Sequence, residues 1–194
     1  ALQVDYIDLY LVHWPGASGV APESPKHRSL REGSWKALES LYRQNKVRAI
    51  GVSNYTQRHL EEMREYAEIG PMVNQCELHP LCPQPGLLHC CHENNIAFTA
   101  YASLGESALL DERKDTVQLS QVCRRRPDLT RAQILLLWGL QHGVAVIPKA
   151  TSVGHLQENI AVADRELSAE QMDMLDCIGE QPERRFCWNP ATVA

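Results

Sequence analysis

The stretch from Asp8 to Pro15, which reads DLYLVHWP, decides how the chain is expected to fold. Most of its residues favour a strand, and it ends in His13, Trp14 and Pro15. Because proline has no backbone N–H to donate to a sheet, the strand is expected to stop there. His13 and Trp14 are therefore expected at one rim of a sheet, where their side chains can reach a ligand.

Five short runs rich in Val, Ile and Tyr predict strands, and the segments between them predict helices. Because strands and helices alternate, we expect parallel strands joined by right-handed crossovers, which is an α/β fold. The predicted strands are Tyr6 to Val12, Val47 to Val52, Met72 to Glu77, Ile96 to Tyr101 and Val144 to Ile147.

The helices are predicted from apolar spacing and from capping residues. Thr56, Thr130 and Ser168 are expected N-caps, the last in a capping box, and Gly143 is an expected helix end. The predicted helices are Glu32 to Asn45, Gln57 to Ala67, Gly86 to Glu93, Arg131 to His142, Ser152 to Val162 and Ala169 to Ile178. Residues 16–29 and 104–114 are predicted to be insertions, and the tail from Gln181 to Ala194 is predicted to be a loop.

The composition is that of one soluble globular domain. The chain has 194 residues, of which 44% are hydrophobic, and a formal net charge of −5. This acidic balance argues against nucleic acid and anionic membranes as partners, and no apolar run approaches the roughly 20 residues that a membrane span needs. The seven cysteines show no disulfide framework, so we expect a reducing compartment and a cytoplasmic protein.

Other chemistries find less support in the sequence. The GxGxxG, GxxxxGK[ST] and GxSxG motifs are absent, which argues against a Rossmann site, a P-loop and a hydrolase elbow. The stretch from Cys76 to His92 is rich in potential metal ligands, but its spacing is irregular and it holds no CxxC pair. We predict no metal site there and keep a zinc-binding module as the weaker alternative to ordinary buried thiols.

Each predicted strand is followed by polar or aromatic residues that its apolar body does not predict. In parallel α/β folds these strand ends lie on one face and build the ligand site. Hydroxyl and amide side chains can bind a carboxamide, a phenol ring can stack on a flat ring, and a lysine can meet a phosphate. A nicotinamide dinucleotide fits this set, which comprises His13, Trp14, Ser53, Asn54, Gln75, Tyr101 and Lys149.

These stretches resemble the aldo-keto reductase family, whose members are NADP(H)-dependent enzymes on a (β/α)8 barrel. The resemblance covers essentially the whole chain and implies a partial TIM barrel, with strands four to eight, their helices, a C-terminal helix and the tail. It implies one NADP-dependent oxidoreductase domain over residues 1–194, truncated at its N-terminus. The stretches similar to the family's strands four to eight are Val4 to Pro15, Val47 to Tyr55, Asn74 to Pro80, Tyr101 to Gly105 and Ile147 to Lys149.

The resemblance also implies a role for each site residue. His13 would be the catalytic histidine that orients the substrate carbonyl, and Trp14 would line the substrate pocket. Ser53, Asn54 and Gln75 would hold the carboxamide of the cofactor NADP(H), and Tyr101 would stack on the nicotinamide. Leu104 would lie by the pyrophosphate and Lys149 at the 2′-phosphate. Glu158 and Asn159 would lie near the adenine.

Four positions depart from the family's pattern. Ala102 and Glu106 stand where small hydroxyl residues are common, and Ala150 replaces a usual serine. His155 stands where an arginine usually helps to hold the 2′-phosphate, and a neutral imidazole is a weaker partner for an anion.

The predicted function is NADPH-dependent reduction of a small aldehyde or ketone to an alcohol. The family's proton-donating tyrosine, with its lysine and aspartate, belongs to the first three β/α units, which this chain lacks, so we expect little turnover from the chain alone. The complete barrel is expected to be a monomer. The alternative is an inactive truncated isoform or decayed copy that acts as a cofactor-binding or interaction protein.

Overall fold

The computed structural model describes residues 3–114, 116–180 and 182–194, so Gln181, the predicted start of the tail, lies outside the described residues. The predicted α/β class is confirmed, since the strand pairs β1–β2, β2–β3 and β4–β5 are parallel and helices connect the strands. In chain order, which is also their order in the sheet, the strands are β1 (Ile7–Val12), β2 (Val47–Ser53), β3 (Val73–Glu77), β4 (Ala97–Tyr101) and β5 (Ala145–Val146).

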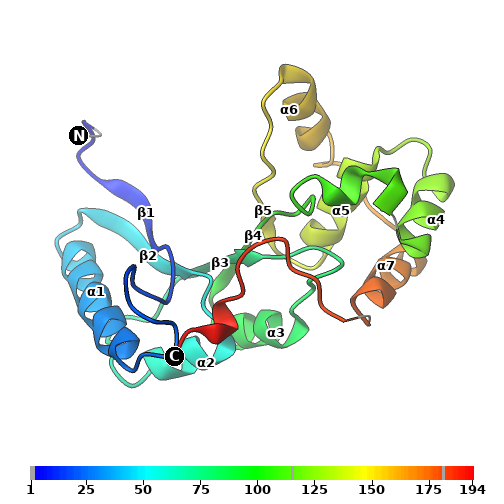
Figure 1. Ribbon diagram of the computed structural model, residues 1–194. Helices are drawn as coiled ribbons and strands as arrows, with labels where there is room; N and C mark the ends of the chain where they lie inside the picture. Colours follow the sequence, from blue (N-terminus) through cyan, green and yellow to red (C-terminus); the bar gives the residue numbers. More distant parts are fainter. Residues whose placement is uncertain (1–2, 115, 181) are drawn as a thin grey trace. The chain divides into compact units, whose positions relative to one another are not determined.

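The chain divides into two compact units (Figure 1). Unit 1 comprises residues 3–76, 85–98 and 189–194, and unit 2 comprises residues 77–84 and 99–188 without 115 and 181. Each unit has its own buried side chains and is described here by itself.

The sheet of unit 1 places the ends of β1, β2 and β3 in register. Val12 lies opposite Val52, and Ser53 lies opposite Gln75. The predicted strand bounds differ from the observed ones by one residue at most in these three strands.

Three helices belong to unit 1, and they are α1 (Lys26–Arg43), α2 (Gln57–Met63) and α3 (Pro85–Glu93). α1 packs against β2 and buries Trp35, whose Nε1 donates to the carbonyl oxygen of Ile69 at 2.9 Å. The prediction was wrong about the start of α1, which lies six residues before Glu32 (Figure 1). Pro25 at the N-cap has φ −65°, a value that suits a helix start, but polar residues after it hide the apolar period.

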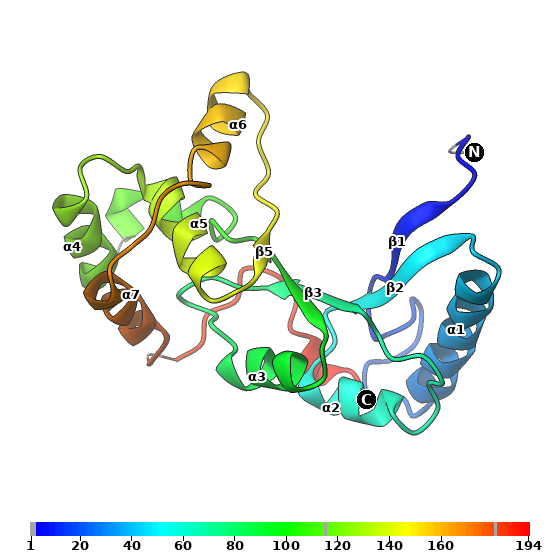
Figure 2. The same ribbon diagram turned by 180° about the vertical axis from the view of Figure 1, so that it is seen from behind.

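Unit 2 contains α4 (Val117–Arg125), α5 (Arg131–Gln141), α6 (Val153–Ile160) and α7 (Ala169–Asp176). α5 is buried over most of its length and packs on β5 and α6, and α4 packs on α7 (Figure 2). In this unit β4 pairs with β5 through Thr99 with Ala145 and Ala100 with Val146.

The prediction missed α4, so two helices rather than one lie between β4 and β5. The Thr116 hydroxyl caps α4 by accepting a hydrogen bond from Leu119 N at 3.2 Å. Only Leu119 and Val122 of this helix are buried. β5 is shorter than predicted, because only Ala145 and Val146 form ladder pairs with β4.

Four residues that were predicted to begin or end helices do so in the structure. Thr56, Thr130 and Ser168 each accept the hydrogen bond expected of an N-cap, and all three belong to capping boxes. Gly143 follows α5 with φ +76°, a conformation that favours glycine. These signals are reliable because each depends on residues within one helical turn.

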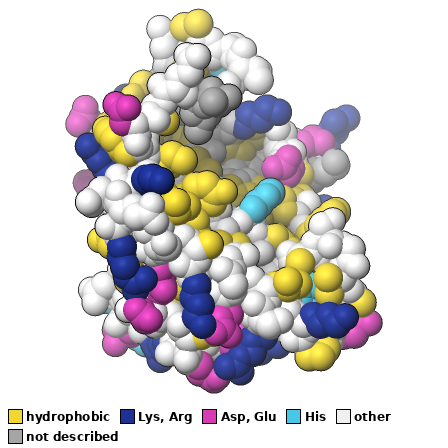
Figure 3. Space-filling model, turned by 90° about the vertical axis from the view of Figure 1, so that its left-hand side faces the viewer, with side chains coloured by type: hydrophobic (Ala, Val, Ile, Leu, Met, Phe, Trp, Pro, Cys, Tyr) yellow, Lys and Arg dark blue, Asp and Glu magenta, His cyan; other side chains and the backbone are white. Residues whose placement is uncertain are grey.

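Charged side chains of both signs are interspersed on the face drawn in Figure 3, and hydrophobic side chains also reach the surface there. In unit 1 the exposed apolar side chains include Leu9 and Tyr10 of β1 and Leu30 of α1. No helix among the described residues is long and apolar enough to cross a membrane.

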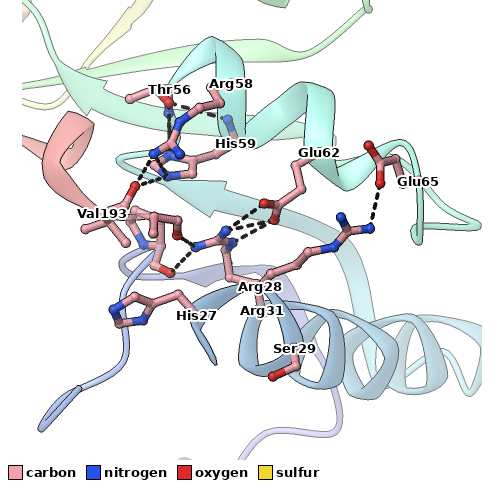
Figure 4. A network of polar contacts seen from close by, with 12 residues as sticks. His27, Arg28, Ser29, Arg31, Thr56, Arg58, His59, Glu62, Glu65 and Val193 are labelled. Carbon is pink, nitrogen blue, oxygen red and sulfur yellow. Dashed lines mark hydrogen bonds and ion pairs between the residues drawn. The ribbon is translucent and has the colours of Figure 1, made fainter. Parts of the chain in front are cut away.

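A polar network in unit 1 holds the last residues of the chain (Figure 4). The Arg31 guanidinium is buried, pairs with both carboxylate oxygens of Glu62 at 2.8 and 3.0 Å, and donates to the Ala194 carbonyl at 2.7 Å. Arg58 donates to the carbonyl oxygen of Val193, and His59 Nε2 lies 3.1 Å from the same oxygen.

His59 is the titratable member of this network. Its Nδ1 lies 3.2 Å from Thr56 N, and only an unprotonated Nδ1 can accept that hydrogen bond. Burial is the main reason why the pKa of His59 falls to about 4. Because the unfolded imidazole binds its proton near pH 6.5, the unfolded state holds more protons between about pH 6.5 and 4.

We therefore expect His59 to make the protein less stable as the pH falls through this window. Its contribution, on the order of 2–3 kcal/mol, should be fully present above pH 6.5 and lost as the pH approaches 4. Urea unfolding of the wild type and of His59→Gln, measured from pH 7.5 to 4.5, checks this.

The His59→Gln variant is a matched control because Gln133 and Gln171 occupy the same position in the two other capping boxes. It should lose stability less steeply over this range than the wild type. Parallel curves for the two proteins would show that His59 is not the group responsible.

Candidate functional site

The carboxyl ends of β1, β2 and β3 bring four predicted site residues together in unit 1. Ser53 Oγ and Asn54 N donate to the Gln75 carbonyl oxygen at 2.7 and 2.9 Å. Asn54 Nδ2 donates to the His13 carbonyl oxygen at 3.0 Å and to Ser53 Oγ at 3.1 Å. These bonds tie three neighbouring strand ends into one rim.

Asn54 has a backbone conformation that most residues avoid. Its φ is +64°, in the left-handed region, where asparagine is enriched because its side chain bonds locally. Ser53 and Asn54 are buried, Gln75 and Trp14 are half-buried, and the His13 side chain is exposed. The rim therefore carries a side-chain amide, that of Asn54, which two hydrogen bonds fix in position, and an exposed imidazole at His13.

Five further predicted site residues line one cavity of about 700 Å³ in unit 2. This volume lies in the range of pockets that hold small molecules and cofactors. Side chains from the end of β4, the loop after it, the segment after β5, and α6 contribute. The predicted residues in the lining are Tyr101, Leu104, Lys149, Glu158 and Asn159.

The loop after β4 forms one wall of the cavity through an unusual run of backbone conformations. Ala102, Gly105, Glu106 and Ser107 all have positive φ, from +50° to +68°. A β-carbon on Gly105 would lie 2.8 Å from both Leu109 and Phe186, so glycine is required there for packing as well as for φ. This loop is tight and its shape is closely determined.

The cavity carries charges of both signs. Lys149 and Arg131 are cationic, Glu106 and Glu158 are anionic, and His155 adds an imidazole ring. Gln133 Nε2 donates to the Glu158 carbonyl oxygen at 3.0 Å, which ties α6 to α5. Such a lining can bind a ligand that has both an anionic group and neutral hydrogen-bonding groups.

Some lining residues were not predicted as part of the site. Thr130, Arg131 and Ala132 at the start of α5 line the cavity. The sequence marked Thr130 as an N-cap, but nothing in it indicated which cavity that helix start would face. Glu106 and His155, identified as departures from the family pattern, also lie in the lining.

The stretch from Cys76 to His92 does not assemble a metal centre in the part of the chain that the structure describes. No group of three or more His, Cys, Asp or Glu side chains is close enough there to hold a metal ion. Cys76, Cys82 and Cys91 are buried, and burial raises the pKa of the Cys91 thiol to about 11. These thiols are packing residues.

Comparisons with known proteins were made for the whole chain. The model of the Aldo/keto reductase family matches residues 1–180. The chain is 42% identical to a 9,11-endoperoxide prostaglandin H2 reductase of Trypanosoma cruzi and 41% identical to a glyoxal reductase of Bacillus subtilis, in each case over 92% of this chain and 59% of the relative. The chain thus spans about three-fifths of the length of these curated relatives.

Solved structures give the same result. An aldo-keto reductase from a Medee basin deep-sea metagenome library matches with a TM-score of 0.82 and 31% identity, over 99% of this chain and 66% of that chain. A variant of Gox0644 in complex with NADPH matches with a TM-score of 0.83 and 30% identity, over 98% and 65%.

Two substitutions at Asn54 test how the rim of unit 1 is held. Asn54→Ala loses the bonds to His13 and Ser53 and keeps a β-carbon in the left-handed region, so we expect a loss of about 2 kcal/mol in the free energy of unfolding. Asn54→Gly loses the same bonds without the backbone strain and should cost about 1 kcal/mol less. Urea unfolding measures both, and equal losses would show that the backbone conformation is not a source of strain.

Proposed function

The chain belongs to the aldo/keto reductase family, and from this premise we propose that the protein reduces small aldehydes or ketones to alcohols with NADPH. The family uses NADP(H), and similar solved structures contain it. Because the chain spans about three-fifths of its curated relatives, the activity is proposed for the whole protein. We also propose a cytoplasmic location, a single domain over residues 1–194, and a monomeric complete barrel.

The proposal rests mainly on the cavity of unit 2. Its lining contains five of the eight residues that the resemblance assigns to NADP(H). Lys149 would pair with the 2′-phosphate, Leu104 would lie by the pyrophosphate, and Glu158 and Asn159 would lie near the adenine. The cavity's size and mixed charge fit such a ligand.

The resemblance assigns the reactive end of the cofactor and the substrate carbonyl to residues of unit 1. Ser53, Asn54 and Gln75 would hold the carboxamide, and the fixed amide of Asn54 would present its groups with little loss of rotamer freedom. Trp14 would give the substrate an apolar wall. The exposed His13 imidazole would donate a hydrogen bond to the carbonyl oxygen and so orient the substrate and stabilise negative charge there. When bound, NADPH supplies the hydride.

The proposal places β1 to β5 as strands four to eight of the family's barrel. On this assignment the proton-donating tyrosine, with its lysine and aspartate, is not among these 194 residues. Neither Tyr6 nor Tyr10 would replace it, since both precede the rim residue His13 on the same strand segment. The chain by itself is therefore proposed to bind cofactor and to turn over little.

One observation favours the alternative of a decayed copy that only binds partners. Glu106 lines the cavity, and a carboxylate there repels a phosphate. The two proposals differ in cofactor affinity, because a decayed site would bind NADPH weakly or not at all.

Activity tests the main proposal. We expect the complete protein to oxidise NADPH in the presence of a reactive aldehyde, followed by the loss of NADPH absorbance. His13→Ala should lower kcat by about 100-fold, because one hydrogen bond to the developing charge is lost. NADPH oxidation no faster than that of the His13→Ala variant would refute the reductase assignment.

Cofactor preference tests the role of Lys149. Lys149→Met should weaken NADPH binding by about 10- to 100-fold, as expected for a lost charged hydrogen bond, and should leave NADH binding unchanged. Fluorescence titration of this chain with each nucleotide measures both. Equal losses for NADPH and NADH would mean that Lys149 does not contact the 2′-phosphate.

A further inference from the structure

Glu77, at the end of β3, has a carboxylate that the proposed mechanism does not use. Its side chain and that of His79 are both fully buried, and His79 Nε2 lies 3.1 Å from Glu77 Oε1. No partner for His79 Nδ1 lies within the described residues, so a neutral ring with its proton on Nε2 fits this geometry. A buried carboxylate beside a neutral imidazole needs further donors.

The tail supplies those donors. The backbone N–H of Phe186 donates to Glu77 Oε1 at 2.6 Å, and that of Cys187 donates to Oε2 at 3.3 Å. Burial alone would raise the pKa of Glu77, but the bonds from His79, Phe186 and Cys187 outweigh it and lower the pKa of this carboxyl below its usual value. Two of the three residues that bond to this carboxylate therefore belong to the tail.

Residues 183–187, which we call the strap, run along the segment after β3 in unit 2. Arg184 N donates to the Leu81 carbonyl oxygen at 2.8 Å, and Arg185 donates to Gln84 Oε1 at 2.9 Å. These anchors lie near the surface, whereas the bonds to Glu77 are made to a fully buried group. Glu77 is therefore the interior anchor of the strap.

The strap also contacts the wall of the cavity. The Phe186 ring lies 5.1 Å from the His79 ring, centroid to centroid, and fills the space that Gly105 leaves open in the loop after β4. The side chains of Cys187 and Tyr101 lie close enough to interact. The backbone carbonyl of Tyr101 in turn accepts from Leu78 N at 3.2 Å. Tyr101 is thus held from the segment after β3 and from the strap.

We propose that Glu77 is a positioning residue for the cofactor site, because its carboxylate fixes the strap and the strap, through Cys187, fixes the Tyr101 ring. This inference rests on the proposed function, in which Tyr101 stacks on the nicotinamide. It gives Glu77, which would not contact the ligand, a part in cofactor binding. The strap would then support binding of the nicotinamide half of the cofactor rather than of the nucleotide half.

The test compares two ligands by fluorescence titration of the full chain. NADPH carries the nicotinamide, whereas adenosine 2′,5′-bisphosphate carries only the nucleotide end that Lys149 would hold. Glu77→Gln keeps the shape of the side chain but loses its charge, and it should weaken NADPH binding about tenfold while changing adenosine 2′,5′-bisphosphate binding by less than about twofold. Glu170→Gln, a matched change at an exposed residue of α7, should change neither.

Cys187→Ala tests the path and keeps the proposal testable if Glu77→Gln fails to fold. It removes the link to Tyr101 without touching the buried pair, and it should reproduce the selective loss of NADPH affinity. The double variant should lose no more than either single one, since both act through the same contact.

If Glu77→Gln weakens the binding of both ligands equally, Glu77 has a merely structural role and the proposal is overturned. Additive losses of NADPH affinity in the double variant would also overturn it, and so would a normal NADPH affinity in Cys187→Ala. If the wild type binds both ligands and Glu77→Gln binds them equally well, the positioning role falls and the proposed function stands. If the wild type binds neither ligand, the proposed function falls and the positioning role falls with it.

Discussion

The geometry of parallel pairing is the constraint on which the candidate site depends. In a parallel sheet every strand ends at the same edge, so residues that are far apart in the sequence become neighbours wherever their strands stop. In unit 1 the register of Ser53 with Gln75 sets the rim, and Asn54 then reaches the carbonyl oxygen of His13 from the next strand end. The backbone hydrogen bonds between the strands take no part in the reaction, but they determine where the residues with the imidazole and the amides lie.

The same constraint explains how much of the fold the sequence could predict. Strands β1 to β3 and the capped helix starts rest on short-range patterns, namely apolar runs and hydroxyl N-caps, and these were predicted within one residue. The first turns of α1 were missed because the residues that follow Pro25 are mostly polar. α4, the first of the two helices between β4 and β5, was missed as well, and it packs on α7, a contact that no local pattern encodes.

The site was predictable to a similar extent. Strand ends and family resemblance identified five residues that do line one cavity, and four that share one rim. What they could not show is which partners each residue has. Glu77 is the last residue of a predicted strand, but the backbone groups that bind it follow 109 and 110 residues later in an aperiodic tail. A carboxylate that binds backbone N–H groups leaves no side-chain signature at the other end of the contact.

The balance of charges in the cavity of unit 2 determines how strongly the departures from the family pattern affect the binding of an anion. Glu106 lies in the lining but its side chain is exposed, so water screens its charge, and two unit charges in water interact by only about 1 kcal/mol even at about 4 Å. A direct charged hydrogen bond from a lysine contributes about 1.5–3 kcal/mol, so in the proposed binding mode one contact from Lys149 would outweigh the repulsion from Glu106. The acidic residue would then weaken anion binding without reversing it, and the proposed phosphate site would depend on a short contact at Lys149 rather than on a positive field across the whole cavity.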